Sequence, residues 1–522
     1  METAEMRRST LQRKDRDELT EIAKTLGKKP SSRARKGEII DLILDLAAGG
    51  DGSGANGADA SEASESSTSE SAAESNETEA STSDDGAESS DDSDDDNDGS
   101  NDGSANDASV DADNRPEPGN RRRRRRGRDR DNRNESNEQW DGDPIPAEGR
   151  LDLRSEGYGF LRVNGYTPSR DDAYVPVKLV RQFGLRKGDV IAGPSRPANR
   201  NEKNPALMSV ETVNGAEPDT AGNRPEFDDL VAVHPTERLT LERGDGTDAA
   251  ARLVDLVAPI GKGARGLIVA PPRSGKSTVM QQIITSIQAN HADTHLMVLL
   301  VDERPEEITA MTRALGDANG EVVASAFDRP TDEHVHIADL AIERAKRLVE
   351  DGRDVVVIVD GITRLARAYA TETPSSNKTL PGGLDAAAMV GPKQFFAAAR
   401  NVEDGGSLTV LATASTDNGN AVDEAILAEL VGAANLELRL DRSLAERRAY
   451  PAIDVAASST RHEDHLFDAD TLAQVAVLRG FVADVAAERG TAAAHAEMLD
   501  LLGASKTNDE FLREVGKSTS AS

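Results

Sequence analysis

The sequence has no cysteine and no long apolar run, and each absence excludes some classes of protein. None of the 522 residues is cysteine, which excludes disulfides, thiolate metal sites and cysteine nucleophiles and suits a reducing compartment. Apolar runs such as 296–301 fall far short of the roughly 20 residues that a membrane-spanning helix needs. The first residues are charged, so we expect no signal peptide. These absences predict a soluble cytoplasmic protein with no membrane partner.

The acidic residues are concentrated in one segment. The formal net charge is -32, and residues 51–113 contain 21 Asp or Glu and no Lys or Arg. This segment is otherwise rich in Ser, Ala and Gly, so it cannot bury enough apolar surface to offset its ordering entropy. We therefore predict a disordered acidic linker, and the net charge of the chain says little about what its folded parts bind.

A basic arm follows the linker. Residues 121–126 are six consecutive arginines, and Arg128, Arg130 and Arg133 extend the run. Like charges at this density favour an extended segment. The arm could attract RNA phosphates without reading sequence, or it could mainly pair with the acidic linker beside it.

A small helical unit is predicted before the linker, over residues 8–47. Leu19, Ile22, Ala23 and Leu26 have helical spacing, and a second helix is expected from Lys36 onward. Basic residues lie between the two helices. They either contact nucleic acid or form a solvated surface.

The middle of the chain predicts a small barrel. Residues 149–214 alternate apolar and polar side chains between Gly, Pro and Asn turns, as at Phe160, Leu161, Tyr174 and Val175. Several short strands within about 65 residues suit a barrel of the OB type.

The remaining sequence predicts an α/β domain. The runs 267–270, 296–302, 355–360 and 408–414 are almost entirely apolar, as expected for parallel strands that are buried on both faces. Amphipathic helices such as 337–349 separate them, which favours a helix-covered parallel sheet.

These segments predict a multidomain fold with an α unit, a β barrel and an α/β ATPase domain. The expected boundaries are a helical domain (1–48), a linker with the arginine arm (49–146), an RNA-binding barrel domain (147–216), a connector (217–235) and the ATPase domain with C-terminal helices (236–522).

Residues 266–278 (GLIVAPPRSGKST) are typical of a phosphate-binding loop between a buried strand and a helix, which we expect over 278–288. In such loops backbone N–H groups face the phosphates. Here the Lys276 ammonium would reach the β and γ oxygens, and the Ser277 hydroxyl would be a Mg²⁺ ligand. Ala270 stands where the usual pattern has Gly. The segment predicts ATP and Mg²⁺ as ligands.

Two acidic residues at strand ends complete a predicted catalytic set. Asp360 ends the run 355–360, where a carboxylate can hold Mg²⁺ directly or through water. Glu303 follows the run 296–302 and could polarise the attacking water. Because the carboxyl ends of parallel strands meet at one edge of a sheet, we expect both beside the phosphate loop.

Several motifs together resemble one family, the bacterial transcription termination factor Rho. The motifs are residues 270–277 (APPRSGKS), 302–307 (DERPEE), 360–369 (DGITRLARAY), 398–409 (AARNVEDGGSLT), 451–454 (PAID), 459–461 (STR) and 506–512 (KTNDEFL). The similarity extends from the helical unit to the C-terminus and is interrupted only by the linker.

The resemblance implies a homohexameric ring of RecA-like motor domains. Such a ring hydrolyses ATP, moves along single-stranded nascent RNA toward its 3′ end as an RNA/DNA helicase, and releases transcripts from the RNA polymerase elongation complex. It implies that Lys276, Glu303 and Arg461 are catalytic, with Arg461 as an arginine finger for a neighbouring subunit and Arg448 as a second interface arginine. The implied ATP contacts are Gly261, Lys262, Gly263, Ala264, Arg265, Gly266, Arg273, Ser274, Gly275, Lys276, Ser277, Thr278 and Arg304.

The resemblance also implies RNA contacts at two places. In the barrel, Tyr158, Phe160 and Tyr174 offer faces for base stacking, and Arg162 could take a phosphate or a base edge. Packing in the barrel core is the alternative for the aromatic residues. In the ring channel, Lys378 belongs to a loop (378–383) that matches the mobile RNA-gripping loop of the family.

Some positions depart from the family pattern. Ala421 and Val431 replace lysines of the channel, and Pro381 stiffens the first channel loop. Asn204 replaces a common barrel aromatic. Gly361 replaces a Ser that in some members helps bind the inhibitor bicyclomycin.

Two other classes of protein are also considered. One is another hexameric RecA-like ATPase, such as a rotary synthase or secretion subunit, which Ala270 and residues 302–307 disfavour. The other is a non-enzymatic RNA-binding protein, which Lys276, Glu303 and Asp360 disfavour. No further metal site is expected, since His334 and His336 lack a convergent set of ligands.

Overall fold

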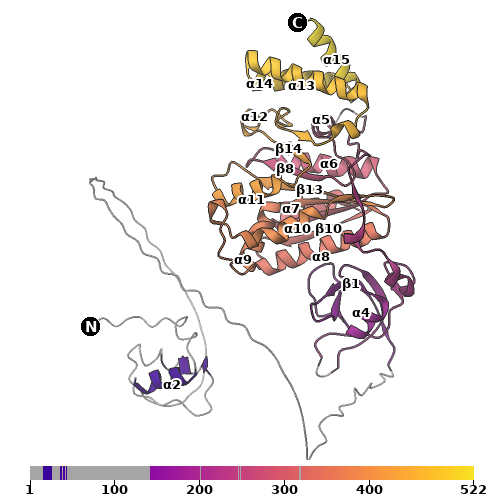
Figure 1. Ribbon diagram of the computed structural model, residues 1–522, viewed down its shortest axis with the longest axis vertical. Coiled ribbons are helices and arrows are strands. Elements are labelled where there is room, and N and C mark those ends of the chain that lie inside the picture. Colours follow the sequence, from indigo (N-terminus) through magenta and orange to yellow (C-terminus); the bar gives the residue numbers. More distant parts are fainter. Residues whose placement is uncertain are drawn as a thin grey trace, which may run out of the picture. The chain divides into compact units, whose positions relative to one another are not determined.

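The computed structural model describes residues 16–25, 36–37, 39–40, 43, 142–199, 202–244, 246, 248–316 and 319–521 (Figure 1). The chain forms two compact units, Met1–Arg124 and Arg125–Ser522. The predicted linker with its arginine arm (49–146) lies outside the described residues, apart from residues 142–146. Within the described part of the chain, no helix combines the length and apolar character that crossing a membrane requires.

The first unit contains the predicted pair of helical segments. Helix α2 (Arg16–Thr25) presents Leu19 and Ala23 to the described helical residues 39, 40 and 43. The side chains of Leu19, Ala23, Ile39, Ile40 and Ile43 form a small buried cluster. Apolar residues at spacings of three and four therefore share one face, as the periodicity predicted.

The second unit begins with a small barrel. Its elements are β1 (Ile145–Leu153), β2 (Gly159–Arg162), β3 (Ala173–Val175), α4 (Val177–Phe183), β4 (Val190–Arg196), β5 (Ala206–Leu207) and β6 (Thr212–Val213). The strand order is β1-β2-β3-β5-β4-β6, and β1 also pairs with β4, which closes the barrel. This closure is the feature that an OB-type barrel requires.

Alternation along the barrel strands separates core from surface. Leu161 and Val175 are buried in the barrel core, whereas their neighbours Phe160 and Tyr174 are part-exposed and pair across β2 and β3. Successive side chains of a strand point to opposite faces, so the same two strands supply both the core and an aromatic outer face.

A connector leads to the second domain of this unit, which is built on a nine-stranded sheet. The connector contains η1 (Pro218–Asn223) and η2 (Phe227–Asp229). The strands are β7 (Ala232–Val233), β8 (Arg265–Ala270), β9 (His295–Glu303), β10 (Gly320–Ala326), β11 (Asp354–Asp360), β12 (Arg400–Val402), β13 (Ser407–Ser415), β14 (Leu436–Arg439) and β15 (Ser459–Thr460). From β10 to β14 the order is β10-β9-β11-β13-β8-β14, and all these pairs are parallel.

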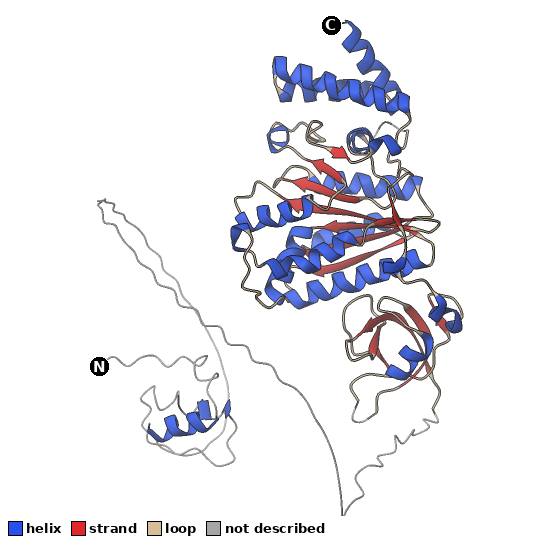
Figure 2. Cartoon of the chain, in the orientation of Figure 1, coloured by secondary structure: helices blue, strands red, loops and turns tan. Residues whose placement is uncertain are grey.

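Helices cover both faces of this sheet (Figure 2). They are α5 (Ala249–Val257), α6 (Lys276–Asn290), α7 (Pro305–Leu315), α8 (Thr331–Glu350), α9 (Ile362–Glu372), η3 (Pro381–Gly383), η4 (Ala386–Met389), α10 (Val390–Ala397), α11 (Ala421–Val431), α12 (Arg442–Glu446), η5 (Glu463–His465), α13 (Ala469–Arg489), α14 (Thr491–Ala504) and α15 (Asn508–Ala521). The four apolar runs predicted as strands are β8, β9, β11 and β13, so the α/β expectation is confirmed.

The two faces of the sheet bury separate clusters. Ile268 on β8 packs in the cluster of α5, α6, α7 and the C-terminal helices, whereas Leu267 and Val269 pack in the cluster of α8 to α11. Because side chains alternate and both faces are covered, the strand sequence is mostly apolar on both faces.

The barrel contacts the sheet domain through charged and polar groups. Arg150 of β1 pairs with Glu321 of β10, and the Tyr166 hydroxyl donates to the same carboxylate at 2.8 Å. Asp152 lies 3.2 Å from His336 of α8. The barrel is thus attached to the edge of the sheet formed by β10 and to α8.

Candidate active site and nucleic-acid interface

The phosphate loop connects β8 to α6 and lines a cleft of about 810 Å³. Helix α6 begins at Lys276, two residues earlier than predicted. Gly275 before it has a φ of 92°, a conformation that glycine adopts without strain. The first N–H groups of a helix have no acceptor within it, so this turn presents backbone donors at the helix start. Residues 270–279 all line the cleft.

Lys276 and Asp360 form an ion pair at the base of this cleft. Asp360 ends β11 and also accepts a hydrogen bond of 2.8 Å from the Thr413 hydroxyl of β13. Burial acts to raise the pKa of Asp360, but the charges of Lys276 and Arg364 and these hydrogen bonds outweigh it and lower the pKa. The carboxylate is therefore held ionised beside the phosphate loop.

Glu303 lies at the end of β9, in a second hollow of about 520 Å³ that shares Arg304 and Arg364 with the first. Its side chain is buried and paired with Arg364. Arg364 also approaches Asp360 at 3.5 Å. Glu303, Arg364, Asp360 and Lys276 thus form a chain of alternating charges, and the predicted convergence of these strand ends is observed.

The side chains at the phosphate loop fit a magnesium nucleotide. Ser277 and Asp360 offer hydroxyl and carboxylate oxygens, which are the ligands that Mg²⁺ prefers. The buried Ser274 hydroxyl oxygen has no hydrogen-bond partner among the described residues. A buried polar atom without a hydrogen-bond partner costs free energy, and a bound ligand would supply the missing partner.

The segment 261–266 lies elsewhere. Gly266 is near the start of β8, whereas the phosphate loop follows its end, and residues 261–266 do not line the cleft. Lys262 instead pairs with Glu237 and Asp354. The contact of this segment with ATP, which the resemblance implies, is therefore not seen at the cleft of its own chain, because the six-residue strand β8 lies between them.

Arg461 lies at the same end of the sheet as this segment. Its N–H donates to Asn435, whose own N–H donates to Arg265 at the start of β8. Burial, together with the charges of Arg400 and Arg461, lowers the pKa of Arg265. At about 3.3 Å per residue, the length of β8 separates Arg461 from its own phosphate loop by roughly 17 Å. Arg461 is exposed and cannot serve the cleft of its own chain.

The other predicted arginines lie at the cleft or close to it. Arg273 and Arg304 line the cleft. Arg448 is exposed two residues before Tyr450, in a left-handed backbone conformation with a φ of 62°.

Two residues of the cleft were missed by sequence reasoning. Tyr450 lines it, is 44% exposed, and lies so close to Gly275 that a Cβ there would be 3.2 Å from its ring. Arg364 joins Glu303 to Asp360. Both residues stand inside or beside motifs of the family, but only the folded chain brings them to the phosphate loop.

The barrel aromatics form one exposed cluster. The ring centroids of Tyr158, Phe160 and Tyr174 are 5.7–6.0 Å apart, and all three residues are part-exposed. Phe160 and Tyr174 line a hollow of about 380 Å³ with Asn204. The alternative of core packing is excluded, since the barrel core is made by other residues.

Arg162 does not belong to this exposed surface. It is 3% exposed, pairs with Asp152, and donates to Asp172 at 2.6 Å. Burial opposes the ionisation of Asp152, but His336 and Arg162 lower its pKa to about 2. Alternation places Arg162 on the same face of β2 as Phe160, but its ion pairs with Asp152 and Asp172 bury its side chain, so in this structure Arg162 is not exposed for the predicted contact with RNA. Its guanidinium lies over the Phe160 ring, 5.6 Å from the ring centroid, in a cation–π contact.

The predicted channel loop 378–383 contacts Ala421, the first residue of α11. A Cβ on Gly382, whose φ is 79°, would lie 2.4 Å from the carbonyl oxygen of Ala421. Lys378 is exposed in this loop, and Val431 ends α11. The backbone of Ala421 thus supports the loop that carries Lys378.

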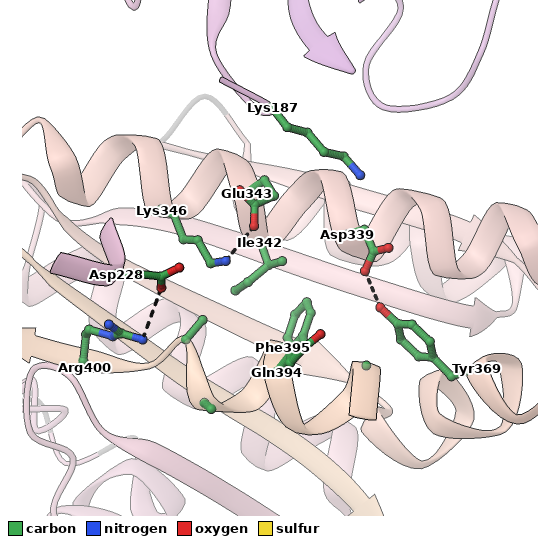
Figure 3. Close-up of a pocket in the computed structure, with 13 residues that line it drawn as sticks. Lys187, Asp228, Asp339, Ile342, Glu343, Lys346, Tyr369, Gln394, Phe395 and Arg400 are labelled. Atoms are coloured by element: carbon green, nitrogen blue, oxygen red, sulfur yellow. Dashed lines mark hydrogen bonds and ion pairs between the residues drawn. The ribbon is translucent and has the colours of Figure 1, made fainter. Parts of the chain in front are cut away.

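A further cavity of about 650 Å³ lies between α8 and α10 (Figure 3). Most of its polar side chains pair with one another: Lys346 with Glu343 at 2.6 Å, Arg400 with Asp228 at 4.0 Å, and Tyr369 with Asp339, whereas Lys187 lines the cavity outside these pairs. Since these pairs already satisfy most of the groups, the cavity lacks the convergent donors of the phosphate loop.

Comparison with known proteins gives two domain matches. Residues 147–219 match the family model "Rho termination factor, RNA-binding domain", and residues 250–460 match "ATP synthase alpha/beta family, nucleotide-binding domain". Among solved structures, an ATPase from the type III secretion system of pathogenic bacteria is 21% identical, with a TM-score of 0.46, and covers 56% of this chain and 87% of that one.

Full-length relatives give the stronger similarity. Transcription termination factor Rho of Pseudomonas aeruginosa is 47% identical over 71% of this chain and 88% of its own length. That of Escherichia coli strain K12 is 46% identical over 72% and 89%, and that of Streptomyces lividans is 49% identical over 72% and 52%. With these full-length similarities and an RNA-binding domain followed by an ATPase-type domain, this chain belongs to the Rho family of transcription termination factors.

Proposed function

We propose that this protein is an RNA-dependent ATPase that moves along nascent RNA as a homohexameric ring and terminates transcription. The observation that carries the proposal is that one chain combines a phosphate-loop cleft with a part-exposed aromatic cluster on a barrel. The partner that follows from this activity is the RNA polymerase elongation complex, and its site of action is the cytoplasm.

ATP hydrolysis would use the alternating charges at the cleft. Phosphates entering beside α6 compete for Lys276 and Arg364, which now pair with Asp360 and Glu303. Asp360 and the Ser277 hydroxyl would then hold Mg²⁺, which would neutralise part of the phosphate charge when bound. The freed Glu303 carboxylate accepts a hydrogen bond from the water that attacks the γ phosphorus.

Completion of each site would need a neighbouring subunit. Arg461 is exposed at the end of β8 that faces away from the phosphate loop, so it can stabilise γ-phosphate charge only in another chain. Arg448 would act at the same interface. This division of one site between two chains is the reason that we expect a closed ring rather than a monomer.

RNA would be held first on the barrel. Bases stacking on Tyr158, Phe160 and Tyr174 would contribute about 1–3 kcal/mol each, whichever base is present. Lys378 would then contact the RNA in the ring channel. The loop that carries Lys378 packs against the backbone of Ala421, which replaces a channel lysine of the family.

The decisive experiment compares ATP hydrolysis by the purified chain with and without pyrimidine-rich single-stranded RNA. We expect turnover to rise by at least about tenfold with RNA, since RNA binding and hydrolysis are coupled in one ring. The double variant Tyr158→Ala/Phe160→Ala should need about 10- to 100-fold more RNA for half-maximal stimulation, which corresponds to one or two lost stacking contacts. Met208→Ala, a change at an exposed apolar residue of the same barrel, is the matched control. Equal turnover with and without RNA would exclude the proposed coupling.

The arginine arm provides a separate prediction. Deleting residues 121–133 should flatten the dependence of RNA affinity on salt concentration, because fewer counterions are released when fewer arginines meet phosphates. The measurement is the slope of log affinity against log salt for the intact and shortened chains. An unchanged slope would indicate that the arm pairs with the acidic linker and not with RNA.

A further inference from the structure

Three histidines from distant parts of the sequence meet on the surface of the sheet domain. His234 lies in the connector, and His462 and His465 lie just after β15. The ring centroid of His462 is 4.6 Å from that of His234 and 5.4 Å from that of His465, and the remaining separation is 6.1 Å. The chain has only eight histidines, so more than a third of them gather at this one place.

The fold brings these segments together through close packing beside them. A Cβ on Gly261 would lie 2.5 Å from the Cβ of Pro235 and 3.0 Å from a methyl group of Leu466. The residues that follow His234 and His465 therefore pack against the same glycine. Nearby, the Arg238 guanidinium stacks on Phe467 at 5.3 Å. These contacts hold the backbones of both segments, so the histidines meet because of the fold and not through loop flexibility alone.

A carboxylate completes the cluster. Ligand atoms of His462, Asp464 and His465 all lie within 4.8 Å of one another, and the carboxylate of Asp464 is 3.8 Å from Nε2 of His465. These three residues and His234 are exposed. Exposure leaves the side chains free to rotate by the small amount that a common ligand would require, and it gives an ion a path from solvent.

The spacing of the rings matches that of imidazoles around one metal ion. Zinc binds imidazole nitrogen at about 2.0–2.1 Å, so three ring centroids at tetrahedral angles would be roughly 5 Å apart. The observed separations of 4.6–6.1 Å bracket this value. Imidazole with one carboxylate suits zinc, nickel, cobalt or copper, whereas Mg²⁺ prefers an all-oxygen set.

We propose that His234, His462 and His465, together with Asp464, form a binding site for a divalent transition-metal ion of the zinc class. The site is separate from the magnesium-nucleotide cleft. His462 directly follows Arg461, so a bound ion would tie the segment after Arg461 to the connector. The other two histidines noted in the sequence do not take part: His334 is buried against Ser325, and His336 contacts Asp152.

The test is a titration of the full chain, free of any histidine tag, with Co²⁺. Visible bands of Co²⁺ intensify when the ion leaves octahedral water for a four-coordinate site, so they report ligation independently of ATPase activity. We expect saturation at one ion per chain, displacement of Co²⁺ by Zn²⁺, and no competition from excess Mg²⁺. Zn²⁺ should also raise the melting temperature, since it binds the folded state.

Conservative variants at exposed positions make the test specific. His234→Gln, His462→Gln and His465→Gln should each weaken Co²⁺ binding by at least about tenfold, because loss of even an outer partner of a ligand typically costs 10- to 100-fold. The control His291→Gln removes a histidine that instead hydrogen-bonds to Thr240 and should bind Co²⁺ normally. Absent bands, or weak non-saturating binding shared by all four variants, would overturn the proposal.

Discussion

Replacing Glu303 with glutamine is expected to lower ATP turnover by about 10²–10⁴-fold, the usual contribution of a positioned general base. The amide has nearly the same shape but cannot take up a proton from the attacking water. ATP binding should change little, because the residues that line the phosphate cleft are Lys276 and its neighbours, whereas Glu303 lies in the adjoining hollow. Turnover is measured with saturating RNA, and ATP affinity is measured separately by equilibrium binding.

The structure adds a reason to measure ATP affinity in this variant. In the chain of alternating charges, Glu303 competes with the nucleotide for Arg364. Glutamine binds that guanidinium less strongly, so ATP affinity should stay equal or rise slightly. Glu307→Gln is the matched control, since this exposed glutamate lies in the first turn of α7 and does not line either hollow. Turnover close to that of the unchanged protein would remove Glu303 from its proposed role.

Replacing Arg461 with alanine should reduce turnover by about 10³-fold or more, because arginine fingers contribute on the order of 10³–10⁵ in rate in other systems. The defect should appear in the hydrolysis step and leave ATP affinity nearly intact. Arg447→Ala, which removes another exposed arginine, is the control. A near-normal rate for the Arg461 variant would rule out the finger.

A mixing experiment distinguishes action between subunits from action within one chain. Lys276→Ala and Arg461→Ala subunits are each expected to be inactive alone. In mixed rings, the phosphate loop of one variant meets the intact arginine of the other, so some sites are complete. Single-turnover hydrolysis should therefore recover in mixtures of the two. If no mixture recovers activity, Arg461 does not act across an interface.

Local sequence determined the elements and much of the ATP site. Short apolar runs between turn residues favour strands that are covered on both faces, and β8, β9, β11 and β13 are such strands. A loop followed by Gly275-Lys276-Ser277 has one favourable arrangement, with phosphates at the start of a helix. Because parallel strands end at one edge of the sheet, Asp360 and Glu303 could be assigned to that edge before any contact was known.

Only the tertiary structure decided which residues face each other across the sheet and the barrel. Residues 261–266 are close to the phosphate loop in sequence but are separated from it by the whole of β8. Arg162 shares a face of β2 with Phe160 but is buried by Asp152 and Asp172, since alternation along a strand assigns a side chain to a face and does not determine its partners there. The histidine cluster joins position 234 to positions 462 and 465. Contacts between residues so far apart in sequence depend on how the chain packs. No local sequence pattern predicts them.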